Sequence, residues 1–138
     1  MKGYFDASVV IPLFLEDAFT ARAVALLQTP ELTPVISDWA ALEVSNVVSR
    51  RLRIQALTPR EALATLADFD LWRGRSCVGA DTSAVDVVTA TLFVRRMDLV
   101  LRGPDAVHLA IADRVGAVIY TFDDRMALAA TALGLAVG

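Results

Sequence analysis

The chain has 138 residues, 56% of them hydrophobic and 21% charged, with a net charge of −3 at pH 7. This length predicts a single domain, residues 1–138, with a sizeable core, and the negative charge argues against a protein that coats nucleic acid. The mean hydropathy of +0.54 is high, but no segment approaches the roughly 20 uncharged residues of a membrane span, so the apolar surplus predicts helices on both sides of a sheet or a face that a partner covers.

The first predicted element is a buried strand that ends on a carboxylate. Gly3–Phe5 is the apolar run, and Asp6 sits where that strand leaves the sheet. In open α/β sheets this edge is where ligands bind, so we expect Asp6 to anchor a cluster of acidic side chains from distant parts of the chain. Ser8 is expected to cap a helix that runs through Leu15.

Glu43 stands out among the next predicted elements. It lies on a long helix, and its neighbours three and four residues away place it on or beside the apolar face. A half-buried carboxylate is costly unless it is paired or bound to a metal. The elements expected in this part of the chain are a helix over Asp17–Gln28, a strand over Thr33–Ser37, and a helix capped by Ser37 or Asp38 that runs to about Arg53.

The second half of the chain continues to alternate helices with strands. Thr58-Pro59-Arg60-Glu61 is typical of a helix start, and Gly116–Thr121 is the clearest strand because it is almost continuously apolar. The alternation predicts an α/β fold with a mostly parallel sheet of about four or five strands. The expected elements are a helix from Thr58 to about Trp72, a strand over Ser76–Ala80, a helix from Asp81 or Thr82 to about Arg96, a helix over Ala106–Arg114, the strand over Gly116–Thr121, a helix over Arg125–Leu133 and an edge strand over Leu135–Val137.

Four acidic residues are predicted to meet at the carboxyl edge of this sheet. Asp6 and Asp123 follow strands. Asp105 heads a helix that enters from the same edge, and Glu43 lies on the helix after another strand. Gathered carboxylates repel each other unless a cation lies between them, and Mg²⁺ or Mn²⁺ suits oxygen ligands. Such a metal is suited to phosphodiester hydrolysis, whereas one cysteine and one histidine cannot build a zinc site.

These acidic residues also have structural interpretations. An aspartate after a strand is commonly a helix cap, and a glutamate beside an apolar stripe can be paired with an arginine. The arginines themselves have two interpretations, as solvated helix faces or as phosphate contacts around an acidic centre. They are grouped as Arg50, Arg51 and Arg53, as Arg73 and Arg75, and as Arg95 and Arg96.

Four short motifs, in this order along the chain, resemble those of one family. They are Asp6-Ala7-Ser8 after the first strand, Trp39-Ala40-Ala41-Leu42-Glu43-Val44, Pro104-Asp105-Ala106-Val107-His108-Leu109-Ala110, and Thr121-Phe122-Asp123 after the last core strand. Each motif alone is weak, but four in order at matching structural places are fairly specific. Over its whole length the chain resembles the PIN-domain ribonucleases, and most closely the VapC-type toxins of type II toxin–antitoxin systems.

The resemblance implies a PIN-like three-layer sandwich and a metal-dependent endoribonuclease that hydrolyses RNA phosphodiester bonds with Mg²⁺ or Mn²⁺. The expected catalytic set is Asp6, Glu43, Asp105 and Asp123. The metal would be held by Asp6, Asp105 and Asp123, with Glu43 as a further candidate ligand. The expected supporting residues are Ser8, Thr121 and Asp124, and the expected contacts to RNA phosphate are Arg50, Arg51 and Arg53. His108, one turn after Asp105, is expected to be a structural hydrogen-bonding partner rather than a general base.

The resemblance also implies protein partners. A cognate VapB-like antitoxin would cover an apolar groove with its C-terminal segment and block the site, and the toxin itself would form a homodimer without contacting a membrane. A cytoplasmic location is expected from two features of the sequence. Cys77 is alone, which excludes an internal disulfide, and Lys2 is followed at once by a strand-like segment rather than a signal peptide.

Two other functions fit parts of the pattern. A haloacid-dehalogenase-like phosphatase would use Asp6 as a nucleophile, with Ser37 and the Asp123-Asp124 pair in supporting places. That enzyme class wants a second acid where Ser8 stands and a mid-chain lysine, whereas Lys2 is the only lysine here. The other alternative is a catalytically silent PIN-like module for binding or assembly. Unneeded buried carboxylates would cost such a module stability.

Overall fold

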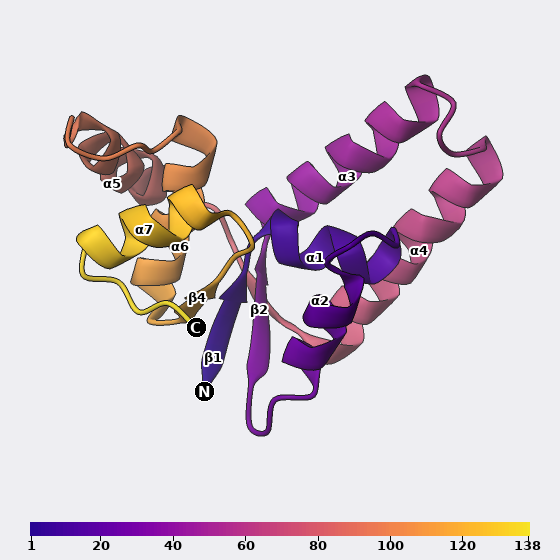
Figure 1. Ribbon diagram of the computed structural model, residues 1–138, viewed down its shortest axis with the longest axis horizontal. Coiled ribbons are helices and arrows are strands. Elements are labelled where there is room, and N and C mark those ends of the chain that lie inside the picture. The colour runs from indigo at the N-terminus through magenta and orange to yellow at the C-terminus, as the bar shows by residue number, and fades with distance from the viewer.

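The computed structural model describes all 138 residues, as a four-stranded parallel sheet flanked by helices (Figure 1). The strand order is β3-β2-β1-β4, which confirms the predicted α/β class. The strands are β1 (Lys2–Phe5), β2 (Thr33–Ser37), β3 (Val78–Ala80) and β4 (Val118–Tyr120). The helices are α1 (Ala7–Phe14), α2 (Thr20–Leu27), α3 (Asp38–Arg53), α4 (Pro59–Ser76), α5 (Ala84–Arg95), α6 (Gly103–Val115) and α7 (Asp124–Ala132).

Each face of the sheet carries its own apolar core. Successive residues of a strand point to opposite faces, so Tyr4 and Val35 pack with residues of α5, α6 and α7. Phe5 and Ile36, the next residue in each strand, pack instead with residues of α1, α3 and α4. Figure 1 shows the same division, with α5 to α7 on one side of the strands and α1 to α4 on the other. The arrangement is the three-layer sandwich that the resemblance implied.

Asp6, not Ser8, caps the first helix. The Asp6 backbone is extended, and its Oδ1 accepts a hydrogen bond from the Val9 N–H at 3.3 Å. Ser8 lies inside the first turn of α1, where its hydroxyl donates to Asp6. The prediction of a Ser8 cap is wrong because Asp6 alone joins β1 to α1, and a side chain at that position reaches the free N–H groups of the first turn.

Several other boundaries in the second half differ from the predicted ones. Helix α4 runs to Ser76, about one turn beyond Trp72, and β3 is correspondingly short. Helix α5 is capped by Ser83 rather than opened by Asp81 or Thr82. Helix α6 begins three residues early, before its proline, because proline is compatible with the first turn of a helix. In place of the predicted C-terminal edge strand there is one isolated parallel bridge, between β4 and the last residues of the chain.

An ion pair with one buried partner joins α5 to α6. The Asp86 side chain is fully buried and accepts hydrogen bonds from Arg114 Nε at 2.7 Å and Nη2 at 3.0 Å. Asp86 also accepts the Ser83 N–H at 2.8 Å and so completes a capping box at the start of α5. Burial by itself would raise the pKa of Asp86, but the hydrogen bonds from Arg114 and Ser83 outweigh it and hold the pKa below its usual value.

Helix α5 also accounts for part of the apolar surplus in the sequence. Val85, Val88 and Leu92 are each more than half exposed on it, and Met97 and Val100 follow on the exposed segment before α6. Solvent-facing apolar side chains in such number are typical of a surface that a partner covers. None of the helices has the length and apolar character needed to cross a bilayer.

Candidate active site

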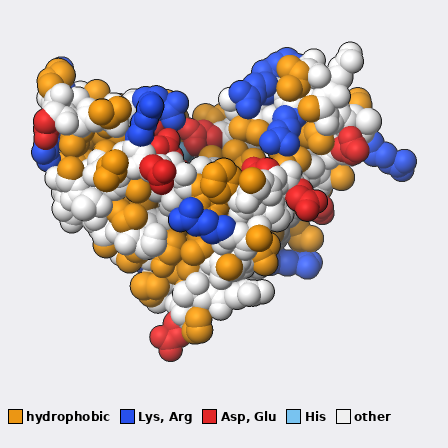
Figure 2. Space-filling view, in the orientation of Figure 1, with side chains coloured by type: hydrophobic (Ala, Val, Ile, Leu, Met, Phe, Trp, Pro, Cys, Tyr) orange, Lys and Arg blue, Asp and Glu red, His pale blue; other side chains and the backbone are white.

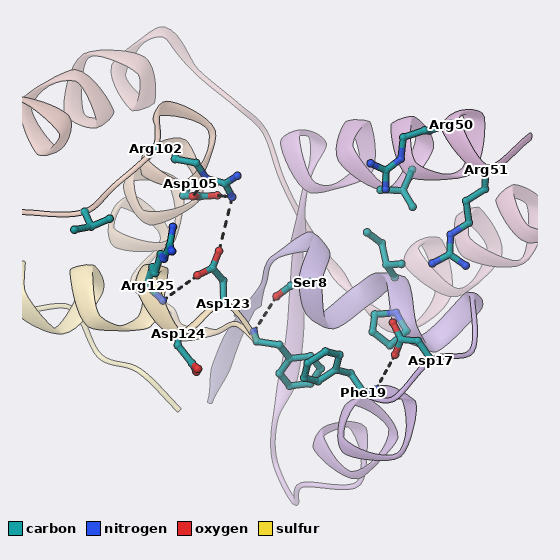
Figure 3. Close-up of a pocket in the computed structure, with 15 residues that line it drawn as sticks. Ser8, Asp17, Phe19, Arg50, Arg51, Arg102, Asp105, Asp123, Asp124 and Arg125 are labelled. Carbon is teal, nitrogen blue, oxygen red and sulfur yellow. Dashed lines mark hydrogen bonds and ion pairs between the residues drawn. The ribbon is translucent and has the colours of Figure 1, made fainter. Parts of the chain in front are cut away.

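A cleft of about 670 Å³ opens where β1 and β4 lead into α1 and α7. Figure 2 shows it as a hollow between two lobes, with acidic side chains inside and basic side chains on both rims. In the close-up of Figure 3, Arg102, Asp105 and Asp123 lie on one wall, and Arg50 and Arg51 face them from α3. The cleft therefore lies at the carboxyl edge of the sheet, where ligands bind in open α/β folds.

Asp6 is the most buried of the four predicted carboxylates, with 5% of its surface exposed. Its Oδ1 accepts the Ser8 hydroxyl at 2.6 Å, and its Oδ2 accepts the Thr121 hydroxyl at 2.7 Å. Burial raises the pKa of Asp6, because it outweighs these hydrogen bonds, which lower the pKa. The protein thus holds a carboxylate in a place where its negative charge is unfavourable without a cation.

We expect Asp6→Asn to stabilise the metal-free protein. Asparagine can still accept the Val9 N–H as a helix cap, but it removes a buried negative charge. In EDTA at pH 7 the gain should be about 1–2 kcal/mol, or roughly 4–8 °C in Tm.

The pH dependence of this gain has a defined sign. Because the pKa of Asp6 is raised on folding, wild-type stability falls as the pH rises above the unfolded value of about 3.9. Below about pH 4 both states are protonated, so the difference between the variant and the wild type should disappear there. Thermal denaturation across pH checks this, and a difference that is constant with pH would contradict the assignment to the Asp6 charge.

Asp105 and Asp123 are brought together by an arginine. Arg102 donates to both oxygens of Asp105, from Nε at 2.9 Å and from Nη2 at 3.3 Å. The same Nη2 lies 3.7 Å from Oδ2 of Asp123 (Figure 3). The hydrogen bonds and charge of Asp105 raise the pKa of Arg102, and the charges of Asp123 and Glu43 raise it further. One guanidinium therefore lies within electrostatic reach of three of the four predicted carboxylates.

Asp123 is a helix cap as well as a candidate ligand. Its Oδ1 accepts the N–H groups of Arg125 at 2.9 Å and Met126 at 3.2 Å, which begins α7. Its Oδ2 is left for Arg102, and Thr121 Oγ1 accepts the Asp123 N–H at 3.1 Å. The structural interpretation is thus correct for Asp6 and Asp123, and it does not compete with a functional one. Asp124, the first residue of α7, also lines the cleft.

Glu43 is held by a chain of buried hydrogen bonds. His108, only 1% exposed, lies with Nε2 at 2.6 Å from Glu43 Oε2 and Nδ1 at 2.7 Å from the Tyr4 hydroxyl. The Tyr4 hydroxyl is in turn 2.7 Å from the Ser37 hydroxyl. A neutral His108 with its proton on Nε2 satisfies every partner: it donates to Glu43 and accepts from Tyr4, which accepts from Ser37. His108 is thus a structural hydrogen-bonding partner, as expected, and it fixes one oxygen of Glu43.

The donors fit a hard divalent cation in kind, because all of them are carboxylate oxygens. As the side chains stand, no three carboxylate, imidazole or thiol groups surround a common point that could hold an ion. Arg102 instead provides the positive charge next to Asp105 and Asp123. Asp105, Asp123 and Asp124 line the cleft, whereas Asp6 and Glu43 are not among its lining residues. Metal ligation by Asp6, Asp105, Asp123 and Glu43 stays a prediction.

The three predicted phosphate-binding arginines are not equally placed. Arg50 and Arg51 line the cleft, whereas Arg53 lies outside it and donates to Ser49 at 2.7 Å. The other arginine groups include residues with carboxylate partners of their own, since Arg73 pairs with Asp38 and Arg96 with Asp98.

Two features of the cleft escaped the sequence analysis. One is Arg102, whose spacing of three residues from Asp105 was a readable signal, because residues three apart share a helix face. The other is a stacked pair of rings, Phe19 on Phe122 with centroids 5.3 Å apart. Arg22 lies over the Phe122 ring at 4.6 Å. Nothing in the spacing of these residues along the chain predicts this contact.

Comparisons with known proteins give one family. The family model described as PIN domain matches residues 3–132. A search of curated proteins found no match.

Several solved structures share the fold. The Mycobacterium tuberculosis toxin VapC20, which cleaves the sarcin–ricin loop, is 20% identical with a TM-score of 0.73, over 96% of this chain and 95% of that chain. VapBC-1 from nontypeable Haemophilus influenzae is 14% identical with a TM-score of 0.69, over 100% of this chain and 97% of that chain. FitAcB from Neisseria gonorrhoeae is 15% identical with a TM-score of 0.70, over 98% of this chain and 95% of that chain.

Proposed function

Because the chain belongs to the PIN-domain family, we propose that it is a Mg²⁺- or Mn²⁺-dependent endoribonuclease of the VapC toxin type. The observation that carries the proposal is the convergence of all four family motifs on one edge of the sheet. Asp105 and Asp123 share one guanidinium there, Asp6 is linked to Asp123 through the Thr121 hydroxyl, and Glu43 is held by His108.

The residues of the chain would divide the work as follows. Asp6, Asp105 and Asp123 would hold the ion, which when bound offsets phosphate charge and supplies hydroxide as the nucleophile. Ser8 and Thr121 each donate to one oxygen of Asp6 and so fix the plane of its carboxylate. His108 orients Glu43 through Oε2, which leaves Oε1 without a protein partner and available to a ligand or water. These contacts preorganise the site before substrate arrives.

RNA is the proposed substrate, and the walls of the cleft suit its backbone. Arg50 and Arg51 face the carboxylates across the cleft (Figure 3) and offer planar guanidinium groups to phosphate. Because both arginines lie on the α3 side of the cleft, an RNA strand could bind with its phosphates against α3. Its scissile bond would then lie at the opposite, acidic wall. VapC20, one of the structures that share this fold, is a toxin that cleaves the sarcin–ricin loop.

A VapB-like antitoxin and a homodimer are the proposed protein partners. Helix α5 offers apolar side chains that the folded chain leaves in solvent, among them Val85, Val88 and Leu92. One solved structure that shares the fold, with 22% identity and a TM-score of 0.56, is a toxin–antitoxin complex from Klebsiella pneumoniae. A cytoplasmic location goes with this proposal, since such a toxin would have to meet cytoplasmic RNA.

One observation favours a catalytically silent module as the second candidate. Arg102 already neutralises Asp105 and Asp123, so these two carboxylates have a partner without any metal. Asp6 argues for the enzyme, because its buried charge is not offset by an arginine and its pKa is raised. The two candidates therefore differ in whether the protein binds a divalent ion at all.

We expect Mn²⁺ to raise the Tm of the protein, because an ion that binds only the folded state stabilises it. At about a hundredfold excess over its Kd the gain should be roughly 5–10 °C relative to EDTA. Differential scanning calorimetry gives this shift, and sequencing of RNA ends after incubation with total RNA gives the cleavage. A Tm that ignores millimolar Mn²⁺, with no new RNA ends, would favour the silent module.

A further inference from the structure

Arg102 differs from the other arginines of the cleft in what it touches. It makes a two-point contact with Asp105 and lies 3.7 Å from Asp123. Arg125 lines the same wall, yet its side chain makes no ion pair, and Asp123 meets only its backbone N–H. Figure 3 shows the Arg102 guanidinium beside Asp105, with a dashed line that joins it to Asp123. The contact is therefore specific to one side chain rather than a general consequence of basic residues near acidic ones.

The burial of the partners is unequal. The Asp105 side chain is 15% exposed and that of Asp123 is 32% exposed, whereas that of Arg102 is 74% exposed. The carboxylates are thus fixed in the wall, and the arginine reaches them from the solvent side. A side chain so exposed can leave its partners without disturbing the core, and surface ion pairs of this kind are weak.

Arg102 and a divalent ion would need the same oxygen atoms. Both oxygens of Asp105 accept hydrogen bonds from Arg102, and Oδ2 of Asp123 is the oxygen not used in capping α7. A cation that binds these oxygens would compete with the guanidinium, since like charges at such distances repel. Binding of Arg102 and binding of a metal ion at Asp105 would therefore oppose each other.

We propose that Arg102 is an internal counter-cation that competes with the divalent ion for Asp105 and Asp123 and thereby sets the metal concentration at which the site fills. The inference rests on the proposed metal-dependent function and deepens it. Without metal, Arg102 stabilises the acidic wall. With metal, it is released into the cleft. Because the metal ion must first break the ion pair of Arg102, its binding free energy is less favourable by the free energy of that pair. The apparent affinity of the site for its ion is lower as a result.

The test is a Mn²⁺ titration of the full chain by isothermal titration calorimetry, with wild type, Arg102→Gln and Arg125→Gln. Both variants remove one positive charge from the same wall, but only the first removes a contact to Asp105. We expect Arg102→Gln to lower the Kd for Mn²⁺ about fivefold, whereas Arg125→Gln should raise or lower it less than twofold. Equal Kd values for the two variants would overturn the proposal, because they would show that only overall charge matters.

A second measurement separates this inference from the proposed function. In EDTA, Arg102→Gln should lower Tm by about 2–4 °C because Asp105 and Asp123 then repel each other, while excess Mn²⁺ should bring the variant level with wild type. If wild type binds Mn²⁺ and Arg102→Gln binds it no more tightly, the proposed role of Arg102 is wrong while the proposed function stands. If neither protein binds Mn²⁺, both the metal-dependent function and the proposed role of Arg102 are wrong.

Discussion

Asp105→Asn is expected to reduce Mn²⁺-dependent RNA cleavage by a factor of about 100 to 1000 while the fold persists. The side chain lies in the first turn of α6 with both oxygens turned to the cleft-side cation Arg102. Asparagine has the same shape as aspartate, but its neutral amide oxygen is a weaker metal ligand than a carboxylate oxygen. The metal ion should therefore bind less tightly and stabilise the charge of the transition state less. The loss corresponds to about 2.7–4 kcal/mol of transition-state stabilisation, the range seen when one preorganised electrostatic group is removed.

The matched control is Asp113→Asn, the same substitution at an exposed position two turns further along α6. It should leave the cleavage rate within a factor of about two, because it lies outside the cleft. Rates at saturating Mn²⁺ and far-UV circular dichroism of both variants make the comparison. Asp105→Asn protein with more than about a third of the wild-type rate would remove Asp105 from the catalytic set.

Much of this site could be predicted because its parts lie next to secondary-structure boundaries. Asp6 and Asp123 each follow a strand, and parallel strands bring their carboxyl ends to one edge, so their shared location follows from the alternation of elements alone. Glu43 was marked by its position on the flank of an apolar stripe, and its Oε2 indeed meets buried His108 rather than bulk water. Periodicity carries this information because it fixes which residues share a face.

The structure adds what periodicity cannot carry, namely the choice between competing partners. Ser8 has the right residue type for a helix cap, but Asp6 takes that place because it is the one residue between β1 and α1. Arg102 and Arg125 have similar distances along the chain from acidic residues, yet only Arg102 pairs with them. The pairing of Asp86 with Arg114 joins residues 28 positions apart on two helices. Such contacts depend on how helices pack, which one sequence does not show.

That Asp86–Arg114 pair should be the most costly polar contact to remove from the fold. Asp86→Ala is expected to destabilise the protein by about 3–5 kcal/mol, or roughly 12–20 °C in Tm, because Arg114 loses a fully buried partner and α5 loses its capping box. Asp86→Asn should cost less, since an amide oxygen can still accept the Ser83 N–H. Urea denaturation of both variants gives the two free energies of unfolding.

The sign of the pH dependence identifies the charge. The pKa of Asp86 is lowered on folding, so its contribution to stability is complete above the unfolded value of about 3.9 and is lost as the pH falls through the lower folded value. The cost of Asp86→Asn should therefore shrink below about pH 4.

Asp81 is the matched control, because it meets the same Arg114 at 3.5 Å from a side chain that is 78% exposed. Asp81→Asn should cost less than about 1 kcal/mol, and equal costs at the two positions would mean that burial does not determine the strength of this pair.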